Sequence, residues 1–108
     1  MSAVFDYTFH NFHEPISLQQ IASVSNMTTN AFCKYFKQRT NKTYFQLLNE
    51  VRIEHACKLL IKDKDLSISE VALQSGFQNI SNFNRKFKLV KINTPSHYRR
   101  IGGAMNKN

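Results

Sequence analysis

The stretch SISEVALQSGFQNISNFNRKFK (residues 67–88) decides the fold, because a related stretch, SLQQIASVSNMTTNAFCKYFK (residues 17–37), precedes it in the chain. The two align at an offset of 50 positions at their starts and of 51 after one inserted residue. Self-similarity of this kind indicates two copies of one structural unit.

Each unit begins with the pattern of a helix N-terminus. In a capping box, a Ser hydroxyl accepts a hydrogen bond from the backbone N–H three residues on, and a Gln or Glu at that position reaches back. Ser17 with Gln20, and Ser67 with Glu70, fit this pattern. We therefore expect a helix to start directly after Ser17 and after Ser67.

These opening helices are expected to be only about two turns long. Asn26 and Gly76 follow them, and both residue types tolerate the left-handed backbone conformation that ends a helix. A longer helix is predicted next in each unit, over residues 29–40 and 80–91. A short helix, a tight turn and a longer helix form the helix-turn-helix pattern.

The longer helices have a helix-start residue and an apolar stripe. Thr28 and Asn79 are suitable N-caps. Ala22 and Ala72 are small enough for the two helices of each unit to cross closely. The inner stripe is predicted to contain Phe32, Tyr35 and Phe36 in the first unit and Phe83, Phe87 and Val90 in the second.

The rest of the chain also favours helices, so the expected fold is all-α, with about seven helices in a single domain over residues 1–108. Apolar residues recur at three- and four-residue steps through residues 44–61, which predicts one long linker helix with an apolar stripe of Leu47, Leu48, Val51, Ala56, Leu59 and Leu60. An opening helix over about residues 3–12 and a closing helix from Pro95 to about residue 100 complete the domain. Its parts are expected at 15–42 (first unit), 43–61 (linker helix), 66–93 (second unit) and 94–101 (closing helix).

The charge balance is typical of a protein that binds nucleic acid. Lys and Arg total 15 against 7 Asp and Glu, a net charge of +8. Residues 1–60 hold 6 basic and 4 acidic side chains, and residues 61–108 hold 9 and 3. The second half is therefore expected to contribute most of the attraction to phosphate. A basic protein kept soluble by its charge is the alternative interpretation.

The outward faces of the longer helices are the candidate binding surface. At the spacing i, i+3, i+4, i+7 these faces carry basic, amide, hydroxyl and thiol groups and no carboxylate. Such a face suits the DNA major groove, where Arg reads guanine, Asn reads adenine and Lys neutralises phosphate. An ordinary solvated face is the alternative. The residues are Asn30, Cys33, Lys34 and Lys37 in the first unit and Ser81, Asn84, Arg85 and Lys88 in the second.

Further phosphate contacts are predicted at the helix starts and nearby cations. Free backbone N–H groups and the helix dipole favour a phosphate at a helix N-terminus, although capping alone also explains the residues found there. The predicted contacts are Thr28, Thr29, Gln78, Asn79, Lys86 and Arg99, together with Lys37 and Lys88.

Five segments of the sequence form a recognisable set: EVA (70–72), SGF (75–77), FNRKFK (83–88), TPSHYR (94–99) and, in the linker, RIEHACKLL (52–60). Together they resemble the DNA-binding domains of AraC/XylS-type bacterial transcription regulators, and the resemblance covers about residues 15–100. It implies seven helices, with two recognition helices entering successive major grooves of double-stranded DNA. Carried over by position, the base-contacting residues are Asn30, Cys33 and Lys34, then Ile80, Ser81, Asn84 and Arg85.

The chain departs from the family pattern at the ends of both recognition helices. Asn41 and Ile92 stand where the family usually has Gly. Asn can adopt the left-handed conformation, whereas a β-branched Ile resists it. We therefore expect the last recognition helix to end differently, with Asn93 in the strained conformation.

The family usually carries a separate effector-binding or dimerisation domain, which is expected to be missing from this chain. An excised C-terminal domain and a short stand-alone regulator both fit. RNA polymerase is a further candidate partner. Cys33 and Cys57 have no metal-ligand spacing, and no apolar run approaches the ~20 residues of a membrane span. We expect a cytoplasmic protein with free thiols, no cofactor and no membrane partner.

The sequence also bears on functions other than DNA binding. His10 and His13 share a helix face near Glu14 but lack a further metal ligand, and no nucleotide-binding Gly loop or nucleophile motif is present, so an enzyme is not expected. An RNA binder would expose aromatic side chains for base stacking, whereas these are predicted to be internal. A docking module that binds protein, or a non-specific polyanion binder, is the remaining alternative.

Overall fold

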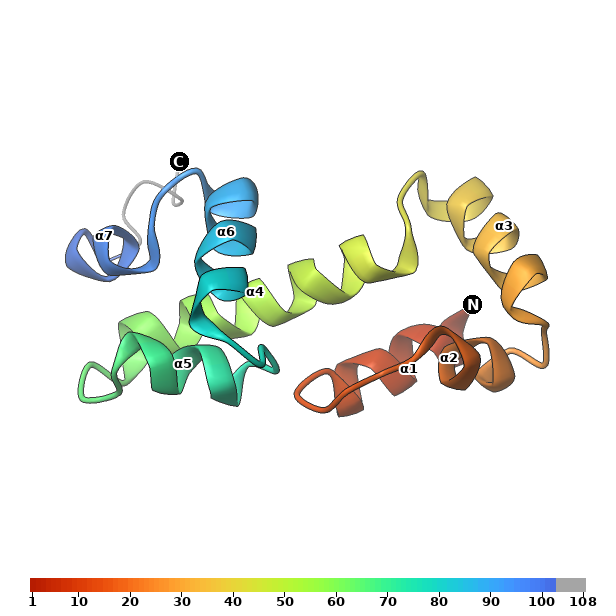
Figure 1. Cartoon of the computed structure of the whole chain (residues 1–108), viewed down its shortest axis with the longest axis horizontal. Coiled ribbons are helices and arrows are strands. Elements are labelled where there is room, and N and C mark those ends of the chain that lie inside the picture. The colour runs from red at the N-terminus through yellow and green to blue at the C-terminus, as the bar shows by residue number, and fades with distance from the viewer. Residues whose placement is uncertain (103–108) are drawn as a thin grey trace. The chain divides into compact units, whose positions relative to one another are not determined.

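The computed structural model describes residues 1–102, and the regular elements in that range are all α-helices (Figure 1). This confirms the all-α prediction. The helices are α1 (Ser2–Asn11), α2 (Leu18–Val24), α3 (Thr29–Thr40), α4 (Tyr44–Lys62), α5 (Ile68–Gln74), α6 (Ile80–Lys91) and α7 (Pro95–Arg100).

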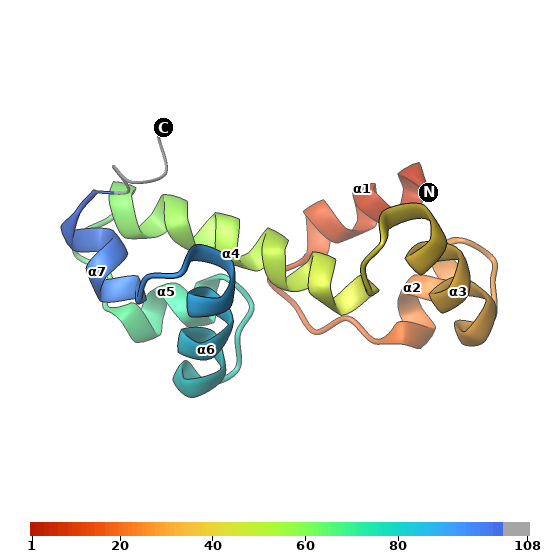
Figure 2. The same cartoon turned by 90° about the horizontal axis from the view of Figure 1, so that it is seen from above.

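The chain forms two compact units, each of which contains one of the helix-turn-helix stretches. The first compact unit comprises Met1–Val51. In this unit α2 packs against both α1 and α3, as Figure 2 also shows from above. The Thr8 hydroxyl of α1 lies 2.7 Å from the hydroxyl of Tyr44, the first residue of α4. The core of the unit consists of Val4, Ile16, Ile21, Ala22, Phe32, Phe36, Tyr44 and Leu48.

The second unit starts at Arg52, so α4 begins in one unit and ends in the other. Here α6 packs against α5 and α7, an arrangement visible in both Figure 1 and Figure 2. The core of this unit consists of Ile53, Ala56, Cys57, Leu60, Val71, Ala72, Phe77, Phe83, Phe87 and Tyr98. The residues that the repeat aligns, such as Phe36 and Phe87, are therefore buried in both units.

The local signals for helix starts are confirmed. Both capping boxes are complete: the Ser17 hydroxyl accepts from the backbone N–H of Gln20 at 3.1 Å, and the Ser67 hydroxyl accepts from that of Glu70 at 3.0 Å. The two bonds that the Ser67 backbone and side chain form with Glu70 hold the pKa of that carboxyl below its ordinary value. The short helices end where a left-handed residue was expected, with φ of 57° at Asn26 and 101° at Gly76.

Two expectations about α6 are wrong. Val90 is 38% exposed and does not belong to the core. Ile92 itself takes the left-handed conformation, with φ 71° and ψ −26°, so the expected shift of strain to Asn93 does not occur. Its backbone N–H donates to the Lys88 carbonyl at 2.8 Å. This bond completes the last helical turn and fixes the conformation despite the β-branched side chain.

The inner faces of α3 and α4 also differ in part from the prediction. Tyr35 is half-buried, and the Arg39 guanidinium lies 5.4 Å from its ring centroid. In α4, Tyr44, Ile53 and Cys57 are core residues that the predicted stripe omitted. None of the helices among residues 1–102 combines the length and apolar character needed to cross a bilayer.

Candidate nucleic-acid interface

The outward face of α3 contains the residues that its spacing predicted. Asn30, Cys33, Lys34 and Lys37 are all exposed. The opposite side of the same helix holds the fully buried Phe32 and Phe36, because residues three and four apart share a face. No Asp or Glu occurs in α3, whose cations are two Lys and one Arg. The face is therefore basic and offers one amide and one thiol.

The outward face of α6 has the same geometry and stronger hydrogen-bonding groups. Ser81, Asn84, Arg85 and Lys88 are exposed, while Phe83 and Phe87 on the opposite side are fully buried. Ile80 is 36% exposed in the first turn and presents an apolar group beside this face. α6 also lacks carboxylates and contains four cations. It is the more basic of the two helices.

Hydrogen bonds inside α6 orient Arg85. The Asn79 side chain caps the helix by accepting from the backbone N–H of Asn82 at 2.7 Å. The Asn82 side-chain oxygen then accepts from Arg85 Nη2 at 3.0 Å. A guanidinium held in this way loses less side-chain entropy when it binds a base edge. The Arg85 guanidinium is therefore held in one orientation on the exposed face of α6.

The helix starts use their side-chain oxygens for capping. Thr28 Oγ1 accepts from the backbone N–H of Ala31 at 3.2 Å, and Asn79 Oδ1 caps α6. The groups left for a phosphate are backbone N–H groups of the first turn and the hydroxyl proton of Thr28. Gln78 is exposed beside Asn79, and Thr29 is half-buried.

Arg99 has an internal role that the sequence did not reveal. Its guanidinium donates to three backbone carbonyls: Nε to Leu60 at 3.0 Å, Nη2 to Asp63 at 3.0 Å and Nη1 to Leu66 at 2.7 Å. These carbonyls belong to the end of α4 and the loop that follows. Arg99 is thus engaged inside the second unit and not turned towards a ligand. Lys86 is half-buried and lies off the outward face of α6.

The nearby ion pairs involve cations outside the two faces. Lys42 lies 2.7 Å from Glu50, and Lys91 lies 2.8 Å from Glu54. Partial burial opposes the charged form of Lys91, but its hydrogen bond to Glu54 and the surrounding charges leave its pKa raised. Lys91 therefore stays protonated and joins the end of α6 to α4.

A surface pocket of about 420 Å³ adjoins the end of the α6 face. It was not predicted as a unit, because its residues come together only through the turn between α6 and α7. Lys88, which was predicted from the spacing, is one of its members. The lining residues are Lys88, Ile92, Asn93, Thr94, Ser96, His97 and Arg100.

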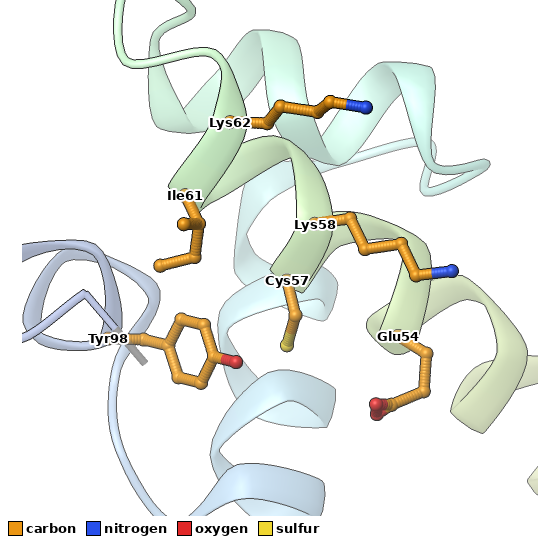
Figure 3. Close-up of a pocket in the computed structure, with 6 residues that line it drawn as sticks. All are labelled: Glu54, Cys57, Lys58, Ile61, Lys62 and Tyr98. Carbon is orange, nitrogen blue, oxygen red and sulfur yellow. The ribbon is translucent and has the colours of Figure 1, made fainter. Parts of the chain in front are cut away.

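A second pocket, of about 450 Å³, lies between α4 and α7 (Figure 3). Tyr98 points towards the thiol of Cys57 there, with Ile61 nearby. Burial raises the pKa of the Cys57 thiol, and a hydrogen bond with Tyr98 offsets part of the shift. Cys57 is thus a protonated core residue, whereas Cys33 is exposed, and both thiols are free.

His10 lies in α1, whereas His13 follows the end of that helix. His10 Nδ1 lies 2.8 Å from the Asp6 backbone oxygen, a local helical hydrogen bond. Within residues 1–102, no three His, Cys, Asp or Glu side chains gather closely enough to hold a metal ion.

Comparison with known proteins gives a consistent result. The family described as a helix-turn-helix domain matches residues 21–101. Over 108 residues the chain is 33% identical to an uncharacterised HTH-type transcriptional regulator of Staphylococcus aureus, and it spans 14% of that protein's length.

Solved structures share the fold. The DNA-binding domain of AdpA, a global transcriptional factor in complex with a target DNA, superposes with a TM-score of 0.87 at 25% identity, covering 96% of this chain and 93% of that one. A probable AraC family transcriptional regulator from Rhodopseudomonas palustris has a TM-score of 0.86 at 22% identity, covering 94% of each chain. Family and fold are those of DNA-binding transcription regulators. Because the family match extends over both helix-turn-helix units, this chain belongs to the helix-turn-helix domain family, in its AraC type.

Proposed function

We propose that this chain binds double-stranded DNA sequence-specifically, as the DNA-binding domain of a bacterial transcription regulator that acts in the cytoplasm, where bacterial DNA lies. The observation that carries the proposal is the exposed, basic and carboxylate-free outward face of both α3 and α6. Cations and amides on a helix face match the phosphates and base edges of a major groove. The similarity to the AdpA domain, solved with a target DNA, supports the same function.

The side chains divide into base readers and phosphate contacts. Arg85 and Asn84 can each form two hydrogen bonds to a purine, and Ile80 can contact a thymine methyl group. The proposed base readers are Asn30, Cys33 and Lys34 in α3 and Ile80, Ser81, Asn84 and Arg85 in α6. The proposed phosphate contacts are Thr28, Thr29, Lys37, Gln78, Asn79 and Lys88. Arg99 and Lys86 are left out because of their internal or lateral positions.

The two units are proposed to act together as one domain, each inserting its longer helix into a major groove. Successive major grooves recur about every 34 Å along one face of DNA. The operator would then contain two sequence blocks about one helical turn apart. The second block is expected to be the better defined, because α6 offers Arg and Asn where α3 offers Lys and Cys.

Selection from a random pool of duplex DNA at about 150 mM salt tests this proposal. Two enriched blocks support reading by both units, and a single block means that one unit reads while the other contacts only the backbone. Binding that merely fades as salt rises, with no enriched sequence, would overturn sequence-specific binding and leave a polyanion-binding or docking module. Single-stranded RNA of random sequence is the control ligand and is expected to compete poorly with the selected duplex.

A further inference from the structure

The turn that ends α6 is strained in a way that packing does not explain. Ile92 has φ 71° and ψ −26°, a conformation that costs a β-branched residue roughly 1–2 kcal/mol. Its side chain is 81% exposed, so burial of the side chain does not offset this cost. Backbone strain of this kind tends to be retained where it builds a binding site. The strained turn directs the chain from α6 into α7.

The turn assembles the pocket of about 420 Å³ that Lys88 shares with the outward face of α6. The other polar groups in the pocket are the Thr94 and Ser96 hydroxyls, the Asn93 amide, the His97 imidazole and the Arg100 guanidinium. No Asp or Glu lines it. Every polar residue there can donate a hydrogen bond and two carry a full positive charge, which is the donor set of an anion site.

Hydrogen bonds within the pocket leave its donors available. Thr94 Oγ1 accepts from the backbone N–H of His97 at 3.2 Å, so its hydroxyl proton can point to a ligand. Arg100 Nη2 lies 2.6 Å from His97 Nδ1, which ties the guanidinium to the first turn of α7. Arg100 is exposed, unlike its neighbour Arg99, whose donors are used on backbone carbonyls.

We propose that this pocket binds one phosphate of the DNA backbone next to the bases that α6 reads, with Lys88, Ser96 and Arg100 as its main donors. The inference rests on the proposed function and extends it to residues that the helix face does not include. Lys88 links the two surfaces, because it belongs both to the α6 face and to the pocket. A DNA phosphate is therefore favoured over a free anion. The turn at Ile92 thus acts to set the distance between the base readers and this phosphate contact.

Two variants test the pocket, and neither is expected to disturb the fold. Arg100→Gln removes one exposed charge. Ser96→Asp places a carboxylate in the pocket while favouring the first turn of α7, because negative charge stabilises a helix N-terminus. Each is expected to weaken binding to the selected duplex by about tenfold. Arg100→Gln should also reduce the slope of log affinity against log salt by about one unit.

The matched control is Lys64→Gln, which removes one positive charge from an exposed loop of the same unit. It is expected to change affinity by less than about twofold, as is usual for an exposed charge without a specific contact. If Arg100→Gln and Ser96→Asp behave like Lys64→Gln while the wild-type chain binds the duplex normally, the pocket proposal is wrong and the proposed function stands. A wild-type chain that binds no duplex would overturn both.

Neutral phosphate analogues identify the contact directly. Single methylphosphonate substitutions along each strand remove one charge at a time. At one phosphate beside the sequence block that α6 is proposed to read, the substitution is expected to weaken binding by the wild-type chain. The same substitution should cause no further loss of affinity in the Arg100→Gln variant. Losses that add at every position would contradict the proposal. The proposal would also be contradicted if the NMR signals of His97 shifted with inorganic phosphate but not with duplex DNA, since that result indicates a site for free anions.

Discussion

The two helix-turn-helix units share a core but differ at the point where each longer helix ends. Phe32 and Phe36 in one unit, and Phe83 and Phe87 in the other, are fully buried at aligned positions. Beyond the core the units diverge. Asn41 ends α3 with φ 60° and ψ 18°, which an Asn adopts readily, whereas Ile92 ends α6 with φ 71° and ψ −26°.

The next helix starts also differ at aligned residues. Thr43 and Gln46 form a reciprocal pair at the start of α4, in which the Gln46 side chain accepts from the Thr43 backbone at 2.8 Å. In the second unit, His97 occupies the position of Gln46 but its ring lies against Arg100 instead. At the start of α4, the Thr43 and Gln46 groups therefore bond to each other. At the start of α7, the corresponding groups line a pocket of hydrogen-bond donors. The repeat thus determines the core of both units, while the ends of the longer helices differ in conformation and surroundings.

The largest effect is expected from the shared core. Phe36→Ala and Phe87→Ala should each cost about 3–5 kcal/mol of unfolding free energy, because each opens a cavity among fully buried rings. Thermal or urea denaturation followed by circular dichroism measures the loss. Phe9→Ala, which truncates an aromatic ring that is 57% exposed, is the control and should cost far less. Unequal losses at Phe36 and Phe87 would show that the two cores are not equivalent.

Arg99 distinguishes the second unit in stability. Arg99→Ala removes three hydrogen bonds to backbone carbonyls and should cost about 2–3 kcal/mol, since the carbonyls of Leu60 and Leu66 are left with poorer partners. Arg99→Lys should restore little, because an ammonium cannot match the planar fork of a guanidinium. Denaturation provides the measurement, and Arg100→Ala serves as the neighbouring control. If Arg99→Ala had wild-type stability but reduced DNA affinity, Arg99 would instead be a phosphate contact, as the sequence predicted.

Base reading is expected to be stronger in the second unit. Arg85→Ala should lose about 1–3 kcal/mol of specific binding and relax the preference at one base pair. Lys34→Ala, at the aligned position of the first unit, should cost less specific binding than Arg85→Ala, because Lys lacks the bidentate geometry of Arg. Titrations with both kinds of duplex decide the matter. An equal loss on random DNA in Arg85→Ala would refute direct reading by Arg85.

The two helix ends are expected to respond differently to glycine. Ile92→Gly should raise the unfolding free energy by up to about 1 kcal/mol, because relief of the left-handed conformation outweighs the added flexibility of the unfolded chain. Asn41→Gly should change it by only a few tenths, since Asn already tolerates that conformation. A stabilised Ile92→Gly variant that binds DNA less well would support strain retained for function. No gain in stability would mean that Ile92 is not strained.

The smallest expected effect is on the pH dependence of the unfolding free energy. The lowered pKa of Glu70 means that its capping bonds stabilise the fold fully above its ordinary pKa of 4.5 and lose that contribution as pH falls below it through the lowered folded value. Gln20, at the aligned position in the first unit, does not titrate. Glu70→Gln should therefore flatten the decline of stability below about pH 4.5. Denaturation curves at pH 3 to 6 that are parallel for both proteins would contradict this.

Sequence alone was sufficient to predict the all-α fold, the repeat, the helix starts and the residues on the outward faces. Those features depend on local rules: capping bonds span three residues, and helix faces follow from a period of 3.6. The seven predicted base readers, three in α3 and four in α6, are consequently exposed where expected. Their contacts with DNA stay predictions.

The contacts of Arg99, the conformation of Ile92 and the pocket at α7 depend instead on tertiary packing. Arg99 contacts carbonyls more than 30 positions away in the chain, which no local pattern can indicate. Ile92 was expected to avoid the left-handed conformation on intrinsic preference alone, but the hydrogen bond to Lys88 and the path into α7 require it. The spacing predicts Val90 in the core, yet Val90 lies in the last turn of α6 and is 38% exposed. Local preferences thus place each helix and its faces, while long-range contacts decide which side chains are internal and which remain free to bind.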